Sequence, residues 1–294
     1  MYGGLEAGGT KFVCIIGTGP DDIVDVLRID VGSPDGTLES ALAFFQRATA
    51  SGVHLEGFGI ASFGPLELRP GHPHYGSITN TPKPGWSGTD LIGRFVETLG
   101  VPVGFDTDVN AAALAEGRWG GARSIDAWIY LTLGTGIGGG AVVDGRLVHG
   151  RGHPEMGHIS IQRRSGDRFD GICPFHGDCF EGLASGPAVE ARYGRRAETL
   201  TGQERMAAVE LVGYYLAVGA RSLTYALAPE RIVVGGGLGL MDGVIDAARA
   251  ALDLQLGGYP GLPEHRAASF LVPAELGAIA GPTGALILAE AAAR

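Results

Sequence analysis

The sequence is short of positive charge and of cysteine. Lys and Arg number 22 against 32 Asp and Glu, so the formal net charge is −10 and the pI is about 5.2. Because binding to nucleic acid needs a clustered Lys/Arg surface, this balance argues against a nucleic-acid partner. Three cysteines in 294 residues are too few for a disulfide framework, and we expect reduced thiols.

Uninterrupted apolar segments are also lacking. The N-terminal residues Met1–Glu6 show no basic segment followed by an apolar run, so we expect no signal peptide. The most apolar long stretch, residues 207–228, contains Glu210 and Arg221. That pattern favours a buried amphipathic helix over a membrane span. We therefore expect a cytoplasmic protein that does not bind a membrane.

Glycine, in contrast, is abundant, and its 51 residues cluster in short runs between apolar segments. Residues 65–86 are expected to form a long surface loop. The expected strands are 2–7, 11–16, 23–31, 55–61, 102–105, 127–133, 140–144, 146–148, 231–234 and 269–272. The expected helices are 37–50, 89–99, 109–119, 187–193, 202–226, 241–256 and 282–293.

Both halves of the chain open with a β-hairpin around a glycine turn and continue with alternating strands and helices. This repetition indicates a weak internal duplication with a boundary near Gly120-Gly121. We expect two α/β domains, residues 1–120 and 121–281, with a ligand cleft between them. The last helix, within residues 282–294, is expected to pack back on the first domain.

Three glycine turns follow predicted strands. Residues 134–139 fit G-x-G-x-x-G, but a strand follows, which excludes a dinucleotide fingerprint, and Lys11 lacks the spacing of a P-loop. Each turn alone could be structural, whereas three at strand ends favour phosphate or nucleoside binding. The predicted nucleotide-binding residues are Gly8, Gly9, Thr10, Lys11, Gly134, Thr135, Gly136, Gly235, Gly236 and Gly237.

Asp108 lies between a predicted strand and a predicted helix, in the run Asp106-Thr107-Asp108-Val109-Asn110. One interpretation is a helix-capping aspartate. The other is a proton acceptor, since phosphoryl transfer to a hydroxyl needs a carboxylate placed in line with the γ-phosphorus. Its position at a strand end, after the first phosphate turn, favours the second, whereas Asp106 is expected to be structural.

A metal site is predicted from His158-x₁₄-Cys173-x₂-His176-x₂-Cys179. Two thiolates and two imidazoles suit a tetrahedral zinc ion, and a closed set of four ligands implies a structural role. The alternative is four unrelated loop residues, but exposed loop cysteines in the cytosol would be open to oxidation.

These motifs resemble the ROK family of sugar kinases, which share the two-domain hexokinase/actin-like ATPase (ribonuclease H-like) fold. Residues 6–11 are similar to the family's first phosphate motif, 133–139 to the second and 234–238 to the adenosine motif. Glu6 stands where the family usually has Asp. The resemblance implies an enzyme that uses ATP and Mg²⁺ and forms a homodimer.

The resemblance also implies roles for single residues. Asp108 would be the general base, and Asn110 would contact the sugar. Glu155 and Glu181 would bind sugar hydroxyls, while His158 would bind both zinc and the sugar. Residues 173–187 and 78–86 are similar to the fructokinase branch, so fructose is the first expected substrate and mannose the second.

Other functions stay open at this point. A kinase for glucose or an amino sugar would carry the same motifs. The DNA-binding repressors of the family have a helix-turn-helix before the first phosphate motif, which here starts within the first ten residues. A sugar-binding protein without catalysis is the third alternative, and Asp108 argues against it.

Overall fold

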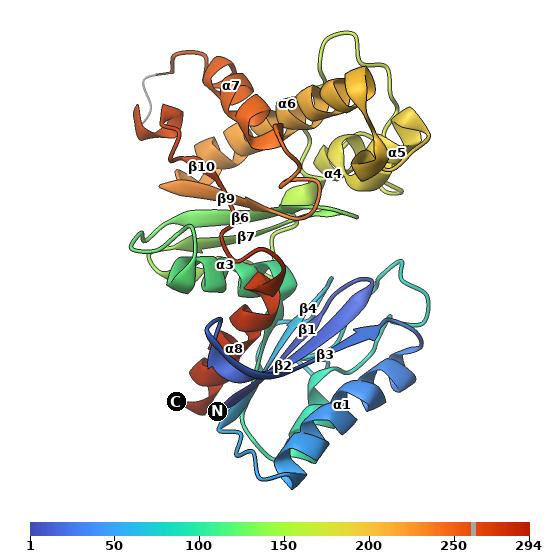
Figure 1. Ribbon diagram of the computed structural model, residues 1–294, viewed down its shortest axis with the longest axis vertical. Coiled ribbons are helices and arrows are strands. Elements are labelled where there is room, and N and C mark those ends of the chain that lie inside the picture. Colours follow the sequence, from blue (N-terminus) through green and yellow to red (C-terminus); the bar gives the residue numbers. More distant parts are fainter. Residues whose placement is uncertain (260–262) are drawn as a thin grey trace. The chain divides into compact units, whose positions relative to one another are not determined.

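The computed structural model describes residues 1–259 and 263–294, which form two compact units (Figure 1). The first unit consists of Met1–Trp119, Val148–Pro154 and Ala278–Arg294. The second consists of Gly120–Leu147 and Glu155–Gly277.

The first unit is built on a mixed sheet with the strand order β3-β2-β1-β4-β5. The strands are β1 (Tyr2–Ala7), β2 (Lys11–Gly19), β3 (Asp22–Asp30), β4 (Gly57–Ser62) and β5 (Val103–Thr107). The hairpins β1–β2 and β2–β3 are antiparallel, whereas β1–β4 and β4–β5 are parallel. The central strand β1 therefore has one antiparallel and one parallel neighbour.

Helices cover this sheet. They are α1 (Pro34–Ala50), α2 (Ile92–Leu99), α3 (Asp108–Trp119) and α8 (Ala280–Ala293). Against α1 lies a core in which the rings of Phe45 and Phe58 are 4.7 Å apart and those of Phe58 and Phe95 are 4.8 Å apart. On its other side the sheet meets α8, which packs on β1, β4 and β5.

The second unit repeats this plan with the strand order β10-β9-β6-β7-β8. Its strands are β6 (Trp128–Leu133), β7 (Ile137–Val143), β8 (Arg146–Leu147), β9 (Arg231–Gly235) and β10 (Leu271–Pro273). Again β6–β7 and β7–β8 are antiparallel, and β6–β9 and β9–β10 are parallel. The helices are α4 (Phe180–Ala184), α5 (Gly186–Tyr193), α6 (Gly202–Leu227) and α7 (Val244–Leu256). The equivalent strand orders confirm the duplication that the sequence indicates.

The structure corrects several expectations. The strand expected at 140–144 begins at Ile137, so the second glycine turn is only three residues long. Helix α4 was not expected, and α2 begins three residues later than expected, at Ile92. The description of residues 65–86 as a surface loop is wrong in part, since Leu66, Ile78 and Trp86 are buried in the first core.

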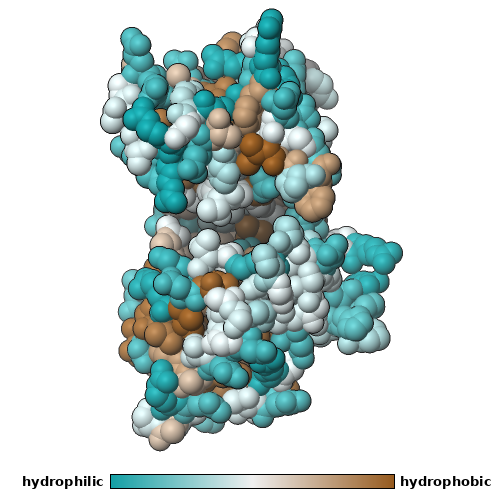
Figure 2. Space-filling view, turned by 90° about the vertical axis from the view of Figure 1, so that its right-hand side faces the viewer, coloured by the Kyte–Doolittle hydropathy of each residue, from teal (hydrophilic) through white to brown (hydrophobic). Residues whose placement is uncertain are grey.

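Apolar residues are concentrated in the two cores. On the face drawn in Figure 2, hydrophilic residues predominate and apolar ones form separate small groups. Within the described ranges no helix combines the length and the apolar character needed to span a bilayer.

Helix α8 approaches its sheet so closely that four strand positions are glycine. A Cβ atom at Gly59 would overlap the carbonyl oxygen of Ala285, and one at Gly104 that of Leu288. Gly4 and Gly57 face the same helix. The approach buries α8 against β1, β4 and β5 and brings the start of the helix to the end of β1.

We predict that Gly59→Ala lowers the free energy of unfolding by about 2–3 kcal/mol, because the methyl group has no room beside backbone atoms of α8. Gly32→Ala is the matched control, since the nearest atom to its Cβ is 4.0 Å away. Its effect should stay within about 0.5 kcal/mol. Urea unfolding followed by circular dichroism measures both, and equal stabilities would contradict the close approach.

Candidate active site

The carboxyl ends of three parallel strands meet at one edge of the first sheet. Ala7 of β1 pairs with Ser62 of β4, and Ser62 pairs with Thr107 of β5. The turn Gly8–Thr10 follows β1 at this edge, and Asp108 follows β5. The fold thus places the first predicted phosphate turn and the predicted base at the same edge of one sheet.

The first glycine turn is tight and open to solvent. Gly8 donates its backbone N–H to the carbonyl oxygen of Lys11 at 3.0 Å, which closes the hairpin. Gly9, Thr10 and Lys11 are exposed, and a Cβ at Gly9 would meet no atom within 4 Å. Backbone N–H groups in such a turn are accessible to an anion.

Asp108 is the first residue of α3, but it is not the capping residue. Thr107 takes that role, since its hydroxyl oxygen accepts from the backbone N–H of Asn110 at 3.2 Å. Oδ1 of Asp108 accepts from the adjacent N–H of Val109 at 2.9 Å. The capping interpretation of Asp108 is therefore wrong.

Glu6 shares this region with Asp108. Burial, and to a lesser extent the negative charge of Asp108, together raise the pKa of Glu6 from 4.5 to about 8. A Cβ atom at Gly281, at the start of α8, would overlap the Glu6 carboxylate, so a larger residue there would force this side chain to move. Near neutral pH Glu6 thus keeps its proton, so the two neighbouring carboxyl groups do not both carry a negative charge.

In the second unit, three glycine segments converge at the end of β6. The carbonyl oxygen of Leu133 accepts from the N–H groups of Leu238 at 3.0 Å and Gly239 at 3.1 Å, so the predicted adenosine motif docks there. Gly134 accepts from Gly186, the first residue of α5, at 2.7 Å. Gly186 was not among the predicted residues, yet its backbone hydrogen bond brings the N-terminus of α5 to the second phosphate turn.

Glu155, His158 and Glu181, all expected to bind sugar, lie together in this unit. Glu155 is partly exposed to solvent, yet enough protein surrounds its carboxylate that desolvation raises its pKa. The nearby His158 lowers the pKa of Glu155, whereas Glu181 raises it. Glu181 differs from expectation in one respect: its Oε2 accepts from the N–H of Ile137 at 2.9 Å. This carboxylate is therefore anchored to the second glycine turn.

His158, Cys173, His176 and Cys179 come together as a possible metal site, with their ligand atoms all within 4.8 Å of one another. Sγ of Cys173 lies 3.7 Å from Nδ1 of both histidines, and Sγ of Cys179 lies 3.6 Å from Nδ1 of His158. Ligands of a tetrahedral zinc ion are roughly 3.5 Å apart, given the usual Zn–S and Zn–N lengths. The donor set and its spacing therefore fit zinc.

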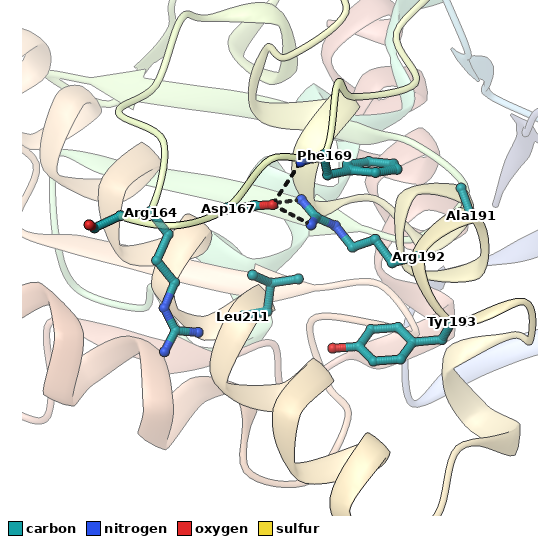
Figure 3. Close-up of a pocket in the computed structure, with 8 residues that line it drawn as sticks. Arg164, Asp167, Phe169, Ala191, Arg192, Tyr193 and Leu211 are labelled. Carbon is teal, nitrogen blue, oxygen red and sulfur yellow. Dashed lines mark hydrogen bonds and ion pairs between the residues drawn. The ribbon is translucent and has the colours of Figure 1, made fainter.

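A separate pocket of about 600 Å³ lies in the second unit, away from all these predicted residues (Figure 3). Asp167 accepts from both terminal nitrogens of Arg192 at 2.8 Å and also from Tyr215. The Arg192 guanidinium lies 4.0 Å over the ring of Phe169. Arg192, followed by Tyr215, holds the pKa of Asp167 far below its ordinary value. The cluster ties the segment between His158 and Cys173 to α5 and α6.

The ion pair between Asp167 and Arg192 was not predicted from the sequence. Asp167 and Arg192 are 25 residues apart, and no local spacing marks them as partners. The same holds for the capping role of Thr107 and for the bond from Ile137 to Glu181. By contrast, the four predicted metal ligands and the glycine turns are all recognisable from short-range spacing.

Comparison with known proteins places these features in a class. A ROK hexokinase from Thermus thermophilus has the same fold, with a TM-score of 0.78 and 30% identity, over 99% of this chain and 98% of that one. The two-sheet architecture with its glycine hairpins is that of the actin-like ATPase fold. The chain belongs to the ROK family, whose sequence profile matches residues 2–292.

Two relatives are similar over most of their length. A fructokinase from Zymomonas mobilis is 42% identical over 99% of this chain and 97% of its own. A fructokinase from Lactococcus lactis is 40% identical over 89% of this chain and 87% of its own.

The protonated state of Glu6 gives a pH prediction. Between pH 4.5 and about 8 the folded protein keeps a proton on Glu6 that the unfolded chain releases. The free energy of unfolding should therefore contain a contribution from Glu6 that is full below pH 4.5 and lost as the pH rises to about 8. Glu6→Gln removes this contribution.

Urea unfolding of the ligand-free protein at pH 5 and pH 9 measures the effect. The free energy of unfolding of Glu6→Gln minus that of the wild type should be more positive at pH 9 than at pH 5. Glu39→Gln, an exposed substitution on α1, should show the same difference at both pH values. A Glu6→Gln difference that does not change with pH would contradict the raised pKa.

Proposed function

We propose that this protein is an ATP-dependent fructokinase, which transfers the γ-phosphoryl group of ATP to D-fructose and yields fructose 6-phosphate and ADP. The observation that carries the proposal is the position of Asp108. Asp108 begins α3 at the same sheet edge as the first glycine turn, and Thr107 rather than Asp108 is the helix cap. The full-length similarity to fructokinases supports the choice of substrate.

The nucleotide is held by glycine turns that carry no side chain to block it. Gly8–Lys11 and Gly134–Gly136 bind phosphate through backbone N–H groups, with hydroxyl groups of Thr10 and Thr135 as further donors. Gly235–Gly237 passes beneath the nucleoside. Mg²⁺, when bound with ATP, neutralises charge on the phosphates.

Asp108 accepts the proton of the attacking sugar hydroxyl. Since phosphoryl transfer depends chiefly on positioning and on charge stabilisation, the base has only to be ionised and in line. Protonation of Glu6 keeps a second negative charge away from Asp108. Asn110, Glu155, His158 and Glu181 bind sugar hydroxyls, and their acceptor oxygens and imidazole nitrogen suit a neutral polyol.

The cluster of His158, Cys173, His176 and Cys179 holds a structural zinc ion. Burial raises the pKa of the Cys179 thiol, so a bound cation is needed to keep it as a thiolate at neutral pH. Zinc would also fix the ring of His158, whose other nitrogen is then directed to the sugar. The homodimer expected from the family resemblance stays a prediction.

Mannose, glucose and amino sugars are the alternative acceptors. A non-catalytic sugar sensor is a weaker candidate, because Asp108 and the glycine turns are all in place.

The substrate prediction is tested by ADP release across a panel of fructose, mannose, glucose and N-acetylmannosamine. We expect the highest kcat/KM with fructose. Asp108→Asn should lower kcat by about 10²–10⁴-fold, because the base is lost while the sugar contacts remain. Asp35→Asn, at an exposed position of α1, should keep wild-type rates. No ADP release with any hexose would rule out the kinase, and a preferred hexose other than fructose would rule out the named substrate.

The zinc prediction is tested by elemental analysis of the purified protein. We expect about one zinc ion per chain, with Cys173→Ser and Cys179→Ser losing most of it because the tetrahedral set is broken. Cys14→Ala is the matched control, since Cys14 is buried in the first core and lies outside the cluster. Equal zinc contents in all three variants would refute the assignment.

A further inference from the structure

Asp106 is a buried carboxylate two residues before the proposed base. Its exposed fraction is 5%, and its Oδ1 accepts from the N–H of Thr107 and from Nδ2 of Asn110, both at 2.7 Å. Its Oδ2 lies 2.9 Å from Nε2 of His149. A carboxylate this deeply buried is tolerated only with such donors, so all three contacts matter for its charge.

The shorter of two contacts indicates where His149 carries its proton. Nε2 lies 2.9 Å from Oδ2 of Asp106 and 3.2 Å from Nδ2 of Asn110, so it could donate to the carboxylate or accept from the amide. Oδ2 of an ionised carboxylate is an acceptor only, and at the shorter distance an unprotonated Nε2 would set two lone pairs against each other. Nε2 therefore bears hydrogen and donates to Asp106. His149 belongs to the segment Val148–Pro154, which returns to the first unit from β8.

Asp106 in turn determines the orientation of the Asn110 side chain. Because Nδ2 donates to Asp106, the amide oxygen Oδ1 must point the other way. Asn110 is fully buried, and its Oδ1 has no hydrogen-bond partner among the described residues. Leaving a buried acceptor unpaired costs about 1–3 kcal/mol, a cost that a ligand hydroxyl would remove.

We propose that His149 and Asp106 are positioning residues for sugar binding: they hold the Asn110 amide with Oδ1 directed at a hydroxyl of the acceptor. The inference rests on the proposed function and extends it, since neither residue was assigned a role in the site. The two residues act through Asn110, and they also brace the start of α3, where Asp108 lies.

Kinetics of three variants test the role. His149→Ala should raise KM for fructose about tenfold, as expected for a lost hydrogen bond to a charged group, and leave KM for ATP unchanged. His149→Gln should restore KM to within about threefold, because its amide N–H can donate to Asp106. His54→Ala is the control, since His54 is exposed and precedes β4 at the opposite end of the strand from Ser62.

A merely structural histidine would lower stability in both His149 variants without a selective effect on the sugar. Thermal midpoints are therefore measured in parallel. A wild-type KM for fructose in His149→Ala, or equal KM values in the Ala and Gln variants, would overturn the positioning role.

A second measurement does not need activity. In ¹⁵N-histidine NMR spectra, His149 should show hydrogen on Nε2, and Asp106→Asn should shift that resonance while the His54 signals stay in place. Hydrogen on Nδ1 alone would overturn the inference whatever the activity. If the wild type phosphorylates no hexose, the proposed function fails, and the NMR result still decides whether His149 and Asp106 are paired.

Discussion

The site depends on the mixed pairing of one central strand in each sheet. β1 and β6 each have an antiparallel partner on one side and a parallel partner on the other. The antiparallel partner requires a tight turn at the carboxyl end of the central strand, and the parallel partner ends at that same edge. In the first unit this puts the Gly8 turn beside the end of β4, with Asp108 one strand further along the same edge, and in the second it puts the Gly134 turn beside Gly236.

Close backbone contacts refine this arrangement. α8 can lie against β1, β4 and β5 because glycine faces it at four strand positions. The start of the same helix reaches the Glu6 carboxylate, whose burial keeps it protonated near neutral pH. Packing of the C-terminal helix therefore contributes to the charge balance around Asp108, although the helix brings no charged side chain of its own to this region.

The second unit relies on cross-links within an irregular segment. Residues 159–179 contain few regular elements, so the Cys/His cluster at one end and the Asp167–Arg192 ion pair in the middle hold them in place. Glu181 follows directly and is bound to the second glycine turn through Ile137. These contacts give Glu155, His158 and Glu181 fixed positions despite the lack of a long helix or strand beneath them.

Much of the fold and of the site was predictable from local patterns. Glycine turns, alternating apolar segments and the Cys-x₂-His-x₂-Cys spacing all reflect contacts between near neighbours, and the family resemblance added the role proposed for Asp108. The five-residue helix α4 was not predicted, because so short a segment has little periodicity. The burial of Trp86 was not predicted, because the composition of a loop does not show which residues pack against it.

What the sequence by itself determined was therefore the order of the elements, the glycine turns and the set of Cys and His residues that could hold a metal. Only the tertiary structure decided that Thr107 caps α3, that burial raises the pKa of Glu6, and that Asp106 pairs with His149 across 43 residues. Such contacts join segments that are distant in the chain. Their partners are chosen by the folded backbone, and no local spacing encodes them.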